Sequence, residues 1–132
     1  MSALIDFLIE ESGKDIVEEV VLSERLKGKP FKIGIMDSTQ HSGYQQAATS
    51  IKKGKKIDFN EKLFNESVII NHCIEPNFKD AEFIGRAGCA TPGQCLNKVL
   101  RAGEVSTLSR KIMELSGFLR DDDELASDAK NS

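Results

Sequence analysis

Tryptophan is absent from the 132-residue sequence, tyrosine occurs once, and there are only two histidines, His41 and His72. Histidine is the commonest general acid or base in catalysis, and aromatic rings form the stacking platforms that bind single-stranded nucleic acid. The glycine-rich motifs G-x-G-x-x-G and G-x-x-x-x-G-K-[ST], which bind nucleotide phosphates, are also missing. The sequence therefore predicts a domain that is not an enzyme and has no cofactor.

Long apolar segments are missing as well. No uninterrupted apolar run exceeds three residues, as in Val68–Ile70, whereas a membrane-spanning helix needs about 20. At the N-terminus, Asp6 interrupts the apolar stretch and no basic residue precedes it, which is not the pattern of a signal peptide. The three cysteines are an odd number, and a domain of this size folds without disulfides. We therefore expect reduced thiols and a cytoplasmic location.

The residues that are present predict one α+β domain, mostly helical, with one β-hairpin near the N-terminus. Hydrophobic residues make up 39% of the chain and charged residues 30%, which is enough for a packed core. Valine and isoleucine in residues 15–22 and the alternating apolar residues of 31–35 predict a hairpin from Asp15 to Met36. Helical spacing of apolar residues predicts helices near residues 2–12, 38–52, 60–74, 80–87, 92–101 and 103–116. We expect the domain to span residues 1–118 and residues 119–132 to form an acidic flexible tail.

Charge is distributed in blocks of opposite sign. Residues 1–24 hold seven acids and one base, whereas residues 25–62 hold three acids and nine bases. Such blocks pair either within one molecule or between neighbouring copies. We expect copies to self-associate, because head-to-tail contacts between unlike blocks build rings or open helices.

The soft metal ligands are His72, Cys73, Cys89 and Cys95. Their spacing argues against zinc, because neighbouring positions 72 and 73 point about 100° apart on a helix and C-x₅-C exceeds the usual separation. Cys73 and Cys95 also fall on apolar faces, where cysteine packs as a small hydrophobic residue. No motif supports a nucleophilic Cys–His pair either. We expect no metal.

The lysine-rich run Lys52–Lys56 has two interpretations. It could bind the phosphates of a nucleic acid. It could equally be a solvated loop after the C-terminus of the helix at 38–52, where cations complement the helix dipole. Composition favours the solvated loop.

The N-terminal helix is more apolar than a single core face requires. Its large side chains are Leu4, Ile5, Phe7, Leu8 and Ile9. The helix either packs on the domain, which is the slightly favoured interpretation, or faces a partner in the manner of a helix that binds in a groove.

Three stretches together resemble the XkdN-like tail assembly chaperones of phages and defective prophages of Gram-positive bacteria. They are V-L-S-E-R-L-K at 21–27, E-P-N-F-K-D-A at 75–81, and the segment 91–118 that ends in L-S-G-F. The resemblance covers about residues 18–125. Ala102 stands where the family pattern has proline, and Val105 where it has tyrosine, which affects only the start of the last helix.

The resemblance implies a non-enzymatic chaperone of the bacterial host cytoplasm that binds the tape measure protein, solubilises it during tail tube assembly, and is absent from the mature particle of the phage or tailocin. For partner binding the exposed apolar candidates are Leu4, Phe7, Leu8, Phe118 and Leu119. The alternatives are a structural tail component retained in the particle, or a small nucleic-acid-binding regulator that uses Lys52–Lys56.

The resemblance also implies a longer form of the protein made by a −1 ribosomal frameshift. The chain ends in Asp128-Ala129-Lys130-Asn131-Ser132, and suitable codons for Ala129, Lys130 and Asn131 would spell a slippery heptamer. We therefore expect the longer form to be a further partner.

Overall fold

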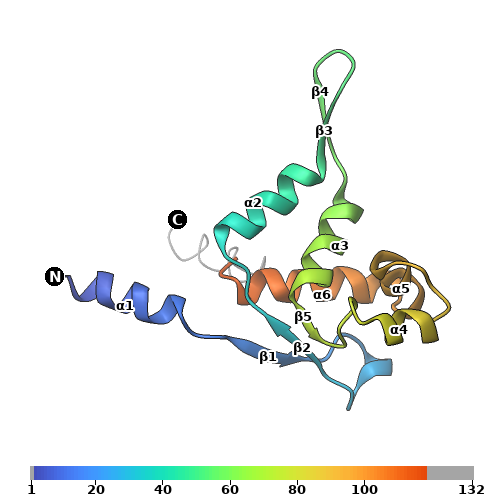
Figure 1. Ribbon diagram of the computed structural model, residues 1–132, viewed down its shortest axis with the longest axis horizontal. Helices are drawn as coiled ribbons and strands as arrows, with labels where there is room; N and C mark the ends of the chain where they lie inside the picture. The colour runs from blue at the N-terminus through green and yellow to red at the C-terminus, as the bar shows by residue number, and fades with distance from the viewer. Residues whose placement is uncertain (1, 119–132) are drawn as a thin grey trace, which may run out of the picture.

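A computed structural model describes residues 2–118 of the chain, which form helices and two small antiparallel sheets, one within the body and one a hairpin that projects from it (Figure 1). The described helices are α1 (Ala3–Ser12), α2 (Ser38–Ala47), α3 (Glu61–His72), α4 (Ala81–Arg86), α5 (Pro92–Val99) and α6 (Ala102–Leu115), with a short 3₁₀ helix η1 (Glu24–Leu26). The strands are β1 (Val17–Val20), β2 (Phe31–Gly34), β3 (Thr49–Lys52), β4 (Lys56–Phe59) and β5 (Cys73–Glu75). The α+β, mostly helical architecture predicted from the sequence is confirmed. The acidic tail expected at 119–132 lies outside the described residues.

The predicted N-terminal hairpin is present as β1 and β2. The two strands are antiparallel, with Val17 opposite Gly34 and Val20 opposite Phe31. The third strand, β5, pairs with the other edge of β2 and gives the order β1-β2-β5. The helix expected at 60–74 therefore ends at His72, because the following residues join the sheet.

The core lies between this sheet and helices α3, α5 and α6. Its completely buried side chains come from β2, from all three of these helices and from the segment after β5. They are Ile33, Val68, Ile69, Phe78, Cys95, Leu96, Leu108 and Ile112. Because α3 and α6 pack directly against each other, Leu108 and Ile112 are completely buried, and Val105 and Leu115 are partly buried against the core.

Capping residues define the start of α5 and the end of α6. The Thr91 Oγ1 accepts a hydrogen bond from the Gln94 backbone N–H (3.1 Å), and Pro92 occupies the first turn of α5. At the end of α6, Gly117 has a φ of 106° and the Phe118 N–H donates to the Met113 carbonyl at 3.0 Å. This Schellman motif fixes where Phe118 lies.

The helix expected at 38–52 and the single hairpin are corrected by the structure. Helix α2 begins with an Asp37–Gln40 capping box and ends at Ala47, and the next residues form a second hairpin, β3–β4. β-branched Thr49 and Ile51 favour strand over helix. Gly54 (φ 84°) and Lys55 (φ 62°) close the turn. The run Lys52–Lys56 is thus the tip of a hairpin rather than a loop that follows a helix.

No helix in the described part of the chain combines the length and the apolar character needed to cross a membrane.

Candidate partner-binding site

Helix α1 exposes a large apolar surface. Its N-terminus is capped by Ser2, whose Oγ accepts a hydrogen bond from the Leu4 N–H at 3.1 Å. None of its ten residues is buried, and the exposed fractions of Leu4, Phe7 and Ile9 are 64%, 58% and 66%. Figure 1 shows α1 extending away from the body, beyond the start of β1. The slightly favoured interpretation, in which this helix packs on the domain, is therefore wrong.

The apolar side chains of α1 form two rows. Residues four apart share a face of a helix, so Leu4 and Leu8, with Phe7 beside them, form one row, and Ile5 and Ile9 form the other. The second row is offset from the first by about 100°. A helix of this length is marginal in water unless a tertiary contact covers it. An isolated α1 therefore favours a partner-facing role for the apolar rows.

The candidate Phe118 lies at the opposite end of the chain, just after α6, and its side chain is 43% exposed. Its ring centroid is 4.8 Å from that of His41 on α2. One hollow of about 220 Å³ on this surface is lined by Phe118, His41 and Asp37, among others. Another of about 400 Å³ is lined by Phe118, by Phe59 at the end of β4, and by residues of α3 and α6. Phe118 is thus a half-exposed ring between two shallow hollows. The remaining candidate, Leu119, lies outside the described residues.

The soft ligands do not converge. The His72 Nε2 lies 2.8 Å from the Tyr44 hydroxyl oxygen, and the Cys89 Sγ lies 3.6 Å from the Ala87 carbonyl oxygen. Burial raises the pKa of the Cys73 thiol to about 12, which leaves it neutral and a poor nucleophile. Burial also lowers the pKa of His72 below its usual value. Within residues 2–118, no three His, Cys, Asp or Glu side chains are grouped to hold a metal ion.

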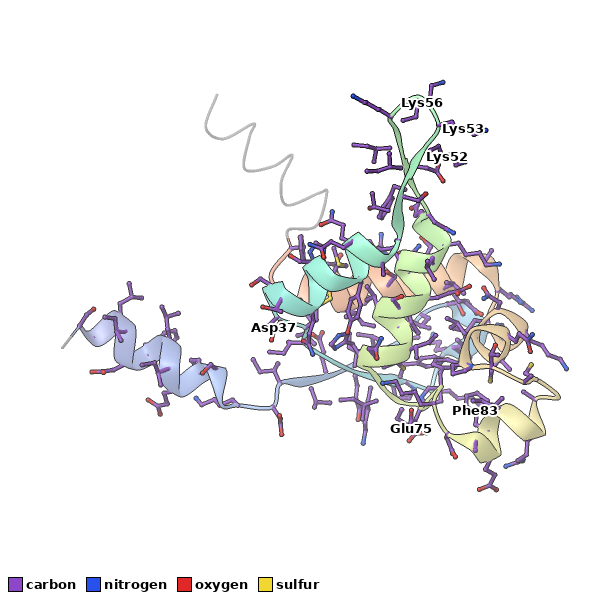
Figure 2. The ribbon with its side chains drawn as sticks, turned by 45° about the horizontal axis from the view of Figure 1, so that its top comes forward. Asp37, Lys52, Lys53, Lys56, Glu75 and Phe83 are labelled. Carbon is purple, nitrogen blue, oxygen red and sulfur yellow. The ribbon has the colours of Figure 1, made fainter. Side chains whose placement is uncertain are left out.

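A second exposed apolar surface, which was not predicted from the sequence, lies on the hairpin of residues 49–59, which we call the β3–β4 arm. Ile51 and Ile57 are directly opposite each other on its two strands and are 77% and 75% exposed. Figure 2 shows Lys52, Lys53 and Lys56 at the end of the arm, away from the body. Two isoleucines that flank a K-K-G-K-K turn were the signal that could have revealed this hairpin.

Four residues of the E-P-N-F-K-D-A string, Glu75, Pro76, Asn77 and Asp80, line a hollow at the other end of the molecule. Its volume is about 540 Å³, and Phe83 and Arg86 also line it. Glu75 and Phe83 lie far from the lysines of the β3–β4 arm in Figure 2. With acids, a base and an aromatic ring together, this hollow has the mixed character of a protein-binding surface rather than the convergent polar groups of a catalytic centre.

Comparison with known proteins gives two matches. A family model described as "Phage XkdN-like tail assembly chaperone protein, TAC" matches residues 4–130. The crystal structure of the protein yqbn has a similar fold, with a TM-score of 0.68 at 19% sequence identity, over 90% of this chain and 99% of that chain. No curated protein matches the sequence.

Proposed function

Because the chain belongs to the XkdN-like family of phage tail assembly chaperones, we propose that it binds the tape measure protein and keeps it soluble while the tail tube assembles. The family model spans almost the whole chain, including α1 and α6. The observation that carries the proposal is the exposure of the Leu4–Phe7–Leu8 row on a helix that has no buried residue.

The mechanism is the masking of apolar surface. A tape measure is a long, partly apolar chain, and its apolar stripe would drive aggregation if it remained uncovered. Leu4, Phe7 and Leu8 lie at i, i+3 and i+4, the spacing with which a helix inserts its anchors into an apolar groove. Phe118, and Leu119 after it, supply a second apolar contact.

Release follows from weak binding by many copies. A short helix with three apolar anchors gives low affinity per copy, and copies that also contact one another along one tape measure raise the avidity without a tight individual contact. The growing tail tube then displaces the copies one at a time. The protein accordingly acts in the bacterial host cytoplasm and is absent from the mature phage or tailocin particle.

Co-purification tests the binding proposal. Phe7→Ser combined with Leu8→Ser removes two anchors that the fold does not bury, so binding to a co-expressed, tagged tape measure is lost while the melting temperature stays nearly unchanged. The matched control is Val21→Ser combined with Ile74→Ser, which removes two side chains of similar exposure (49% and 46%) from the sheet region. Retained binding by the α1 variant, or its loss in the control, contradicts the assignment to α1.

Mass spectrometry of purified particles tests the proposal that the protein is absent from the mature particle. The chaperone proposal requires that the protein be missing from finished tails but present in lysates. A stoichiometric amount in finished tails would instead identify a structural tail component.

A further inference from the structure

The β3–β4 arm is a second element that needs a partner. A two-stranded hairpin by itself is marginally stable in water, and Ile51 and Ile57 remain about three-quarters exposed on one of its faces. The base of the arm is held by the Asn60 N–H, which donates to the Ala48 carbonyl (2.7 Å), and by Phe59, whose ring centroid is 5.6 Å from that of Phe64. The apolar pair lies beyond these contacts, so nothing in the described structure covers it.

The charges around the exposed isoleucines of the arm and of α1 have opposite signs. Among the described residues, Lys53, Lys55 and Lys56 at the tip form no salt bridge, whereas Lys52 lies 3.5 Å from Asp58 on its own hairpin. On α1, Glu11 pairs with Lys14 at 2.7 Å, while Asp6 and Glu10 have no salt-bridge partner within residues 2–118.

The two free carboxylates of α1 lie beside its isoleucine row. Asp6 is three residues before Ile9 and four before Glu10, and Ile5 is four before Ile9, so these four side chains are neighbours on the helix surface. The Ile5–Ile9 row with its acids therefore matches the Ile51–Ile57 pair with its lysines in both polarity and charge.

The two surfaces of one chain point away from the body in different directions. In Figures 1 and 2, α1 extends to one side and the arm projects upward, with the rest of the domain between them. Pairing of two arms would bring the lysines of both tips together, which opposes that contact electrostatically. Among the described elements, α1 of a second copy offers the complementary combination of exposed isoleucines and acids without a salt-bridge partner.

We propose that the β3–β4 arm of one copy packs against the Ile5–Ile9 row of α1 in a second copy, with Lys53, Lys55 and Lys56 facing Asp6 and Glu10. The contact is heterologous, since it joins two different surfaces, and it therefore repeats into a ring or an open chain of copies. It leaves the Leu4–Phe7–Leu8 row uncovered, and it does not depend on tape measure binding.

Sedimentation velocity of the purified full chain tests the contact without any tape measure. The wild type associates as concentration rises, and more weakly at high salt because the charges are screened. Ile51→Ser with Ile57→Ser, and separately Ile5→Ser with Ile9→Ser, each lower the association constant by at least about tenfold. Val21→Ser with Ile74→Ser is the matched control and leaves it unchanged. Circular dichroism verifies that each variant is folded.

Charge reversal identifies the two surfaces as each other's partners. Asp6→Lys with Glu10→Lys places lysines opposite the arm, and Lys53→Glu with Lys56→Glu places acids opposite α1, so each variant alone is monomeric. An equimolar mixture associates again, because the basic arm of the first variant contacts the acidic α1 of the second, and the acidic arm of the second contacts the basic α1 of the first. The two variants then alternate along the assembly. The proposal is overturned by a monomeric wild type, by α1 variants that associate normally, or by a mixture that stays monomeric.

Discussion

Arg25 and Glu104 form an ion pair that joins η1 to the first turn of α6. The Arg25 Nε donates to a Glu104 carboxylate oxygen at 2.6 Å, and the Arg101 backbone N–H donates to the other oxygen at 2.8 Å. Glu104 is only 3% exposed. A buried carboxylate is tolerated when it is paired and hydrogen-bonded, so this pair holds the β1–β2 connection against the helical core.

Removing the Arg25 guanidinium should destabilise the domain. Arg25→Ala leaves the buried Glu104 carboxylate without its cation, and we expect the melting temperature to fall by several degrees. Arg110→Ala is the matched control, because Arg110 is exposed and its Nε lies 3.9 Å from Glu114, a surface ion pair that contributes little. Equal melting temperatures for the two variants would contradict the role given to Arg25.

The same pair makes stability depend on acid pH. The Arg25 guanidinium lowers the pKa of Glu104 from 4.5 to about 2. The unfolded chain therefore takes up this proton first, and the stabilisation is present above about pH 4.5 and lost as the pH falls towards 2. Urea titrations across this range should show a steeper loss of stability in the wild type than in Glu104→Gln. Parallel pH profiles would contradict this assignment.

Gly117 should be hard to replace. Its φ of 106° lies in a region that an L side chain rarely adopts, although nothing lies near the position of an added Cβ. Gly117→Ala should therefore cost about 1 kcal/mol through backbone strain rather than through a clash. Gly43→Ala is a suitable control, since Gly43 lies inside α2 with open space around it and alanine favours a helix. Denaturant unfolding measures both, and a Gly117→Ala variant as stable as the wild type would contradict the strain argument.

The gene can be tested for the longer form. We predict that Lys130 is encoded AAA and that Ala129 ends in A, so that a −1 slip continues into an overlapping frame beyond Ser132. An AAG codon for Lys130, or a −1 frame that stops at once, would exclude the frameshift for this protein.

Local signals predicted much of the fold. Helices α5 and α6 lie close to the predicted ranges 92–101 and 103–116, because residues close in sequence set their ends: Thr91 and Gln94 cap α5, and Gly117 terminates α6. The hairpin of β1 and β2 was also predicted from its alternating pattern.

The second hairpin was missed although its glycine turn signals it, because the segment 49–52 also fits the end of a helix; it becomes a strand because it pairs with 56–59 across that turn. Features that depend on distant contacts could not be predicted. The partner of Glu104 lies 79 positions away, and no sequence pattern joins the two. For the candidate site, the apolar residues of α1 could be identified from the sequence. Only the position of α1 away from the body shows that both of its apolar rows, Leu4–Phe7–Leu8 and Ile5–Ile9, are available to partners.

The most direct test of the central claim is the amount of tape measure protein that stays soluble in cells that co-express this chain. We predict that the wild type and the Val21→Ser, Ile74→Ser control keep the tape measure in the soluble fraction. The Phe7→Ser, Leu8→Ser variant, folded and equally abundant, should leave it in the aggregated fraction. A tape measure that is equally soluble with the α1 variant, or without the chaperone, would contradict the account.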